Sequence, residues 1–311
     1  MMTQQLGATG LDVSRIGLGT VELGLPYGIG ATDLPTDAEA ERILKTAVER
    51  GVTYIDTARG YGVAEERIGK FGISRMEGVL VGTKCAQFLE RGEDLRDDEL
   101  EKLIRDDIEE SLQQLRVDSL QLVQLHGGSA EQIERGELIE IMQKLKDEGK
   151  VQHVGIATRG EDAPLAAIKT GFFATIQTAY SILDQRMARQ VLPQAERDGV
   201  GIINRSVLLK GALTPKWRHL PGTLAPLKAN AEKAQALADQ LGVNLPALAL
   251  RFVLSNPAIS TALIGTINPQ HLEAAIAAAG DGPLPNDVLT ELATLAIDDQ
   301  DQVDPARWPK V

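Results

Sequence analysis

Four polar side chains mark a candidate site for proton transfer: Asp56, Tyr61, Lys84 and His126. Asp56 lies in the apolar run that begins at Tyr54, and Tyr61 follows it in a glycine-rich turn. Lys84 and His126 end the next two apolar runs along the chain. If these runs are neighbouring parallel strands, their carboxyl ends would bring all four side chains to one mouth.

The chemistry that these residue types support is the reduction of a carbonyl group. Such a reaction requires a proton donor for the oxygen that becomes anionic as hydride reaches the carbon, and a phenol with a pKa of about 10 is a poor donor near neutral pH. An adjacent ammonium group would lower the pKa of the Tyr61 hydroxyl, while a carboxylate paired with Lys84 would keep that amine in place and charged. An imidazole near the same oxygen can orient the carbonyl by donating a hydrogen bond.

Taken singly, each of these residues has an ordinary structural explanation, such as a helix cap, a loop tyrosine, a solvated lysine or a buried histidine. Four of them at successive strand ends favour a site for hydride chemistry.

Short apolar runs alternate with longer amphipathic stretches along the chain, which is the pattern of a parallel sheet connected by helices. Eight strands are predicted, at residues 15–20, 54–58, 79–84, 120–126, 153–158, 175–180, 201–206 and 259–266. Because no linker or change of composition interrupts the repeats, a closed (β/α)₈ TIM barrel accounts for them better than a doubly wound open sheet. We therefore expect residues 1–311 to form a single domain.

Caps and glycines predict where helices begin and end. Thr36 and Glu39 form a capping-box pattern ahead of a helix that Gly51 would stop. Asn268 and Pro269 open the last barrel helix, as an N-cap followed by proline at the first helical position.

Segments outside the repeats have predicted roles of their own. Residues 4–6 and 11–13 flank Gly7–Gly10 and predict a β-hairpin that closes the N-terminal end of the barrel. Residues 22–35 and 210–224 are longer than ordinary loops and follow carboxyl ends of strands, where barrel enzymes have their active sites. Candidate pocket residues in or near the loops at that end are Tyr27, Phe88, Trp217 and His219.

Composition restricts the class of partner. The 311 residues carry a formal net charge of -12 with a pI near 4.9, which disfavours binding to nucleic acid or to an anionic membrane. No apolar run is long enough to span a bilayer, and the single cysteine, Cys85, excludes a disulfide within the chain, so we expect a cytoplasmic protein. No metal site is expected, because the four histidines show no ligand spacing.

These residues resemble the signature of the aldo-keto reductase superfamily, in which an Asp-Thr-Ala segment on strand two is followed by Tyr-Gly and then Glu and Gly, with Lys and His on the next two strands. The resemblance covers nearly the whole chain. Residues 15–20 resemble the first strand, residues 176–181 the sixth, residues 199–214 the segment ending the seventh, and residues 264–272 the pyrophosphate segment. It implies a (β/α)₈ barrel and an NAD(P)(H)-dependent oxidoreductase.

By position, the resemblance implies that Tyr61 is the catalytic proton donor and that Asp56, Lys84 and His126 assist it. It also implies that Gln177 contacts the nicotinamide carboxamide. The cofactor-binding residues implied in the same way are Gly19, Thr20, Asp56, Thr158, Gln177, Arg205, Ser206, Leu208, Gly211, Gly265, Thr266, Asn268 and His271.

The chain departs from the family at the nicotinamide end. Ala157 and Thr158 stand where the family usually has Ser-Asn to hold the carboxamide. Arg205 stands where many members have an aromatic residue that stacks on nicotinamide. A guanidinium plane can also stack, but its charge would disfavour the oxidised, cationic ring relative to the reduced one.

It also departs at the adenosine end. NADPH-preferring members place Arg or Lys around the 2′-phosphate, whereas this chain has Ile267 and His271 there, and Ala275 replaces an adenine-contacting Asn. The turn from Gly265 to Asn268 still has a physical reason to bind phosphate, because a helix N-terminus presents free N–H groups. We favour NADP(H) as the cofactor and leave NAD(H) open.

The leading hypothesis is reversible reduction of an aldehyde, ketone or sugar to the alcohol, by direct hydride transfer with Tyr61 as acid or base. The alternative is a regulatory or sensor barrel that binds nicotinamide with little turnover, as the departures at Ala157, Arg205 and Ala275 would suit. A metal hydrolase on the same barrel is a more distant third.

Overall fold

The computed structural model describes residues 2–26 and 33–309. In this part of the chain, eight parallel strands close into a barrel in the order β10-β3-β4-β5-β6-β7-β8-β9. The strands are β3 (Ile16–Gly19), β4 (Tyr54–Asp56), β5 (Leu80–Cys85), β6 (Leu120–His126), β7 (Val151–Ala157), β8 (Thr175–Ala179), β9 (Gly201–Arg205) and β10 (Ile259–Gly265). The predicted barrel is confirmed, and each predicted strand overlaps an observed one.

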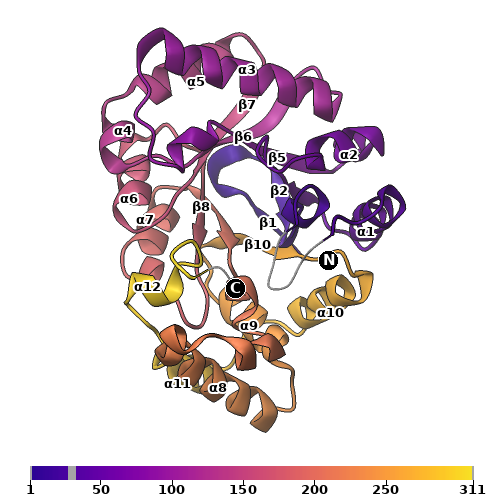
Figure 1. The fold of residues 1–311 in the computed structure, drawn as a ribbon, viewed down its shortest axis with the longest axis vertical. Coiled ribbons are helices and arrows are strands. Elements are labelled where there is room, and N and C mark those ends of the chain that lie inside the picture. The colour runs from indigo at the N-terminus through magenta and orange to yellow at the C-terminus, as the bar shows by residue number, and fades with distance from the viewer. Residues whose placement is uncertain (1, 27–32, 310–311) are drawn as a thin grey trace.

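Helices connect the strands and surround the barrel (Figure 1). They are α1 (Asp37–Glu49), α2 (Ala64–Lys70), α3 (Asp97–Leu115), α4 (Ala130–Glu134), α5 (Glu137–Asp147), α6 (Asp162–Thr170), α7 (Val191–Arg197), α8 (Ala225–Gln240), α9 (Leu245–Leu254), α10 (Pro269–Gly280), α11 (Asn286–Ala293) and α12 (Gln300–Val303). Two helices, α8 and α9, lie between β9 and β10 in the chain. Helix α10 follows β10 and packs beside β3, and α11 and α12 come after it.

Local sequence signals set the starts of α1 and α10. The Thr36 side chain accepts a hydrogen bond from the Glu39 backbone N–H, and the Glu39 carboxylate accepts one from the Thr36 backbone, so the predicted capping box is confirmed. The Asn268 side chain caps α10 by accepting from the backbone N–H of Gln270, with Pro269 at the first helical position.

The N-terminal hairpin closes one end of the barrel, as predicted. It consists of β1 (Thr3–Gln5) and β2 (Asp12–Ser14), which pair antiparallel. An apolar cluster fills this end and combines hairpin and barrel side chains: Leu6, Val13, Tyr54, Leu80, Leu122 and Ile203. Because this end is packed with apolar side chains, the polar interior positions lie toward the carboxyl ends of the strands.

The long segment after β9 is built from short 3₁₀ turns, η6 (Leu209–Gly211), η7 (Pro215–His219) and η8 (Gly222–Leu224). It therefore contains Trp217 and His219, two of the candidate pocket residues, and Trp217 is buried. Phe88, in η4 (Gln87–Leu89) after β5, is buried as well. Tyr27 lies outside the described residues.

Among the described residues, no single helix has the length and apolar character needed to cross a bilayer. One sharply bent pair of segments, residues 222–240 and 245–254, meets these criteria when taken together.

Candidate active site

The structure brings Asp56, Tyr61 and Lys84 into direct contact at the C-terminal mouth of the barrel. Lys84 Nζ lies 2.5 Å from Asp56 Oδ1, 2.9 Å from the backbone oxygen of Thr57 and 3.4 Å from the Tyr61 hydroxyl. An ammonium group has three N–H donors, so these contacts use all of them. His126 adjoins the phenol with its ring centroid 5.9 Å from that of Tyr61, at an interplanar angle of 82°.

The Asp56 carboxylate is held by several donors inside the barrel. Its Oδ2 accepts hydrogen bonds from Gln177 Nε2 at 2.7 Å, from Tyr54 Oη at 3.3 Å and from Gln124 Nε2 at 3.4 Å. Asp56 is 2% exposed and Lys84 is 1% exposed, so the ion pair is buried. A buried charge pair with this many hydrogen bonds holds a defined geometry, because removing either partner would leave an uncompensated charge.

Tyr61 is positioned by a loop that is tied to the barrel wall. The fully buried Glu65, in the first turn of α2, accepts hydrogen bonds from Thr83 Oγ1 of β5 at 2.5 Å and from Arg59 Nη1 at 2.9 Å. Gly62 follows the phenol with a φ of +54°, and a Cβ there would lie 2.2 Å from the oxygen of Gly24. The loop therefore requires glycine at this position to present Tyr61 at the mouth.

Burial and the neighbouring charges shift the pKa values of Lys84 and Tyr61 in opposite directions. Burial is the largest single influence on Lys84 and would lower its pKa, but the charges and hydrogen bonds of Asp56 and Tyr61 together outweigh it, so the pKa is raised and the ammonium stays protonated. Burial raises the pKa of the Tyr61 hydroxyl, and the Lys84 charge offsets this only in part. The expected net lowering of the phenol pKa is therefore wrong, because desolvation is the larger effect in this structure.

His126 stays neutral at physiological pH. Burial lowers the pKa of its imidazole to about 4, Lys84 adds to the shift, and Glu90 opposes it. His126 Nε2 lies 3.5 Å from Glu90 Oε2, and Glu90 Oε1 accepts a hydrogen bond from Arg159 Nη2 at 2.6 Å.

Several predicted nicotinamide contacts lie near the tetrad formed by Asp56, Tyr61, Lys84 and His126. Arg205 donates from Nη2 to the backbone oxygen of Thr158 at 3.0 Å and from Nη1 to Ser206 Oγ at 3.3 Å. The Thr158 hydroxyl is buried and has no hydrogen-bond partner among the described residues, so it is available to a polar group of a ligand. Gln177 is committed to Asp56 by its amide nitrogen, and its contact with a carboxamide stays a prediction.

The other predicted cofactor residues lie around the mouth. Gly19, at the end of β3, pairs in register with Gly265 of β10, and Thr20 donates from Oγ1 to the Asp56 backbone oxygen at 2.9 Å. Leu208 and Gly211 belong to the segment after β9. The remaining ones follow β10 and enter α10: Thr266, Asn268 and His271.

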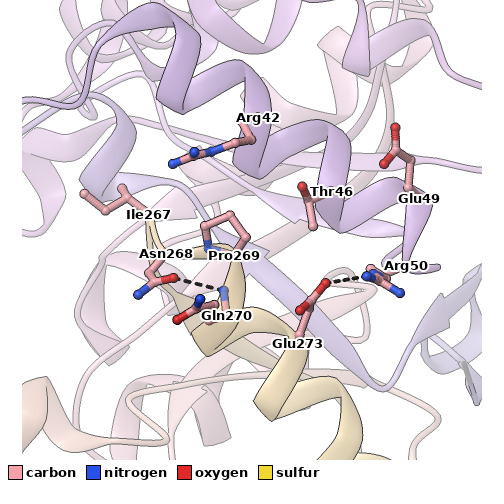
Figure 2. A pocket seen from close by; sticks show the side chains of 9 residues that line it. All are labelled: Arg42, Thr46, Glu49, Arg50, Ile267, Asn268, Pro269, Gln270 and Glu273. Carbon is pink, nitrogen blue, oxygen red and sulfur yellow. Dashed lines mark hydrogen bonds and ion pairs between the residues drawn. The ribbon is translucent and has the colours of Figure 1, made fainter.

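A groove of about 900 Å³ lies between α1 and the start of α10. Figure 2 shows Arg42 extending from α1 toward Ile267, while Arg50 further along α1 forms an ion pair with Glu273 of α10. Arg42 is exposed and forms no hydrogen bond or ion pair with the part of the chain that the structure describes. The groove thus places a cation at the turn where the sequence predicts phosphate binding.

Four further side chains near the predicted site were not predicted from the sequence: Tyr54, Gln124, Glu90 and Arg42. Tyr54 and Gln124 precede Asp56 and His126 by two positions on their strands, and side chains two apart point to the same face. That spacing was a usable signal. Glu90 and Arg42 had none, because only the folded chain places them at the mouth and at the groove.

Comparison with known proteins finds relatives that match nearly the whole chain. A model of the aldo/keto reductase family matches residues 15–297. The chain is 31% identical to L-galactose dehydrogenase of Arabidopsis thaliana, over 95% of this chain and 90% of that protein. It is 28% identical to the NADH-specific methylglyoxal reductase of Escherichia coli (strain K12), over 88% and 92%. The holo form of an aldo-keto reductase from Bacillus halodurans aligns with a TM-score of 0.80 and 27% identity, over 99% of this chain and 100% of that one.

Proposed function

The chain belongs to the aldo/keto reductase family, and we propose that it is an NAD(P)(H)-dependent enzyme that interconverts an aldehyde, ketone or sugar and the corresponding alcohol, with Tyr61 as the proton donor. The observation that carries the proposal is the 3.4 Å contact between the Tyr61 hydroxyl and Lys84 Nζ at the open end of the barrel. A phenol at that distance from a buried ammonium can lose its proton without leaving an unpaired charge.

The side chains divide the work of reduction. Tyr61 is protonated near neutral pH and can donate its proton to the oxygen that becomes an alkoxide, because the adjacent Lys84 charge opposes the rise in the phenol pKa that burial causes. Lys84, kept charged by Asp56, stabilises the phenolate that remains. Neutral His126 donates a hydrogen bond that orients the substrate carbonyl. In alcohol oxidation, the Tyr61 phenolate accepts the proton instead.

A nicotinamide cofactor supplies or accepts the hydride when it is bound. The residues around the mouth fit such a group, since the Thr158 hydroxyl is buried without a partner among the described residues and the Arg205 guanidinium binds the backbone oxygen of the same residue. Thr158, Gln177 and Arg205 would hold the nicotinamide. The backbone of the segment containing Ser206, Leu208 and Gly211 and the turn Gly265–Asn268 would hold the phosphates.

For the choice between cofactors, we propose NADP(H). The sequence lacks an arginine at the usual positions of α10, but Arg42 reaches the same turn from α1 (Figure 2). A guanidinium group suits a phosphate dianion because it is always charged and can donate two parallel hydrogen bonds. His271 and the N-terminus of α10 would add to the binding of a 2′-phosphate.

The test is the variant Tyr61→Phe, assayed against a panel of aldehydes, sugars and alcohols with both cofactors. Turnover should fall by at least about 100-fold, the usual contribution of a general acid, while the dissociation constant of the reduced cofactor stays nearly unchanged. The matched control is Tyr180→Phe. The Tyr180 ring stacks on Phe252, an interaction that phenylalanine keeps, so removal of this hydroxyl should leave turnover intact.

Two results would contradict the proposal. Activity retained by Tyr61→Phe would remove this residue from the proton-donor role. Cofactor binding by the wild-type chain without turnover of any member of the panel would favour the sensor function instead.

A further inference from the structure

Glu90 is a carboxylate at the mouth that the tetrad does not use. It directly follows η4 after β5, and its Oε2 lies 3.5 Å from His126 Nε2, the ring nitrogen that would face a substrate oxygen. This separation is too long for a strong hydrogen bond. Within the described residues no donor bonds to Oε2, and 28% of the Glu90 side chain is exposed, so the carboxylate is accessible to a ligand.

Two contacts fix the position of Glu90, one to its backbone and one to its side chain. Its backbone packs on Gly127, where a Cβ would lie 2.5 Å from Glu90 N and 2.7 Å from Glu90 Cα. Its side chain is held by Arg159, which donates to Glu90 Oε1 at 2.6 Å and to Asp304 Oδ1 at 2.7 Å. The carboxylate is therefore preorganised, and its charge is balanced by a guanidinium that two acidic side chains already share.

We propose that Glu90 determines substrate specificity by accepting a hydrogen bond from a hydroxyl group on the carbon next to the reacting carbon. This rests on the proposed function, in which the reacting oxygen lies between Tyr61 and His126. A group attached to the adjacent carbon then lies on the His126 side, within reach of Glu90 Oε2. The substrates selected are neutral hydroxy-carbonyl compounds of the sugar type.

The same carboxylate disfavours anionic substrates. In a 2-oxo acid the carbon next to the reacting carbon is a carboxylate, and its oxygens would meet the negative charge of Glu90, with Asp304 bound to the other side of Arg159. Two carboxylates brought close together repel strongly where water is partly excluded. A 2-oxo acid should therefore be a poor substrate even though its carbonyl is activated.

Three small aldehydes test the proposal: 2-hydroxypropanal, propanal, which lacks the 2-hydroxyl group, and glyoxylate, in which the adjacent carbon is a carboxylate. Replacing Glu90 by Ala should lower kcat/KM for 2-hydroxypropanal by about 10- to 100-fold, the usual loss for a hydrogen bond to a charged group, and leave propanal almost unchanged. Glu90→Gln should keep part of the preference for the hydroxyl and raise kcat/KM for glyoxylate. The control Glu93→Ala removes an exposed carboxylate from the same loop, one that pairs with Arg91, and should change none of the three.

A binding measurement separates this inference from the proposed function. Ligand-observed NMR with propane-1,2-diol and propan-1-ol needs no turnover. The wild-type chain should prefer the diol, and Glu90→Ala should lose that preference. If the diol preference is present and depends on Glu90 but no aldehyde is reduced, the proposed function fails and the specificity role stands. Equal losses for 2-hydroxypropanal and propanal, or equal binding of diol and alcohol by the wild-type chain, would overturn the role of Glu90.

Discussion

At the level of single residues, burial decides the charge state of His126. Its side chain is 10% exposed, and burial, reinforced by Lys84, lowers the imidazole pKa to about 4 against 6.5 in an unfolded chain. In the proposed reaction an uncharged imidazole can donate a hydrogen bond to the substrate carbonyl without competing with Tyr61 as an acid. The same shift makes stability depend on pH.

The folded pKa of His126 lies below the unfolded value, so between pH 6.5 and 4 the unfolded chain binds a proton that the folded chain does not. Stability is therefore lost as the pH falls through this window, and at pH 5 the loss from this residue should be about 2 kcal/mol. Urea unfolding at pH 7 and pH 5 should show the wild type losing about 2 kcal/mol more than His126→Asn. Identical losses in the two proteins would show that His126 is protonated in the folded state.

Among the elements, the N-terminal hairpin depends on a close backbone approach. Gly7 has a φ of +56°, and a Cβ there would lie 2.2 Å from Gly201 N and 2.6 Å from the oxygen of Gly199. Gly10, in the same hairpin, has a φ of +76° but no atom within 4 Å of the corresponding Cβ. The two glycines thus differ in packing but share a left-handed conformation.

Replacing each glycine by alanine separates conformation from packing. Both Gly7→Ala and Gly10→Ala should lose about 1–2 kcal/mol from the left-handed backbone. Only Gly7→Ala forces backbone atoms apart, which should add about 1–3 kcal/mol. Equilibrium unfolding measures the difference, and kcat below the unfolding transition should be the same in both variants, because the tetrad lies at the other end of the barrel. Equal destabilisation would mean that the hairpin can shift away from β9 without loss.

The regular elements were predictable because their signals are local. Apolar runs located all eight barrel strands, and the capping box at Thr36 and Glu39 located the start of α1. The segment after β9 was not predictable, because Ser206, Leu209 and Lys210 adopt positive φ values that their side chains do not favour. Tertiary packing imposes that conformation.

The candidate site, too, was predictable from the sequence only in part. Asp56, Tyr61, Lys84 and His126 could be grouped because each follows a predicted strand. The contact from Glu90 through Arg159 to Asp304 joins positions 69 and 145 residues apart, with no local pattern to announce it. The sign of the Tyr61 pKa shift also depended on the extent of burial, which only the fold reveals.

That residues 1–311 form a single domain stays a prediction.

For the whole molecule, closure of the barrel has a chemical consequence, because it brings the first and last barrel helices together. β10 pairs with β3, so α1 and α10 lie side by side (Figure 1), and Arg42 reaches the turn before Pro269. An open sheet would separate these helices. In a chain with a net charge of -12, a local cation would be needed to hold the 2′-phosphate of NADP(H) in addition to the pyrophosphate.

Arg42→Ala should therefore weaken binding of NADPH by about 10-fold or more, the usual loss for one charge-assisted hydrogen bond, and leave the dissociation constant of NADH unchanged. Fluorescence titration with each reduced cofactor measures both constants without any substrate. Lys45→Ala is the matched control, since Lys45 lies on the same helix and pairs with Glu41. Glu39, the acidic neighbour one turn before Arg42, is engaged in the capping box and leaves the guanidinium available. If both cofactors weaken equally, Arg42 contacts the adenosine they share, and if neither weakens, the groove between α1 and α10 is not the 2′-phosphate site.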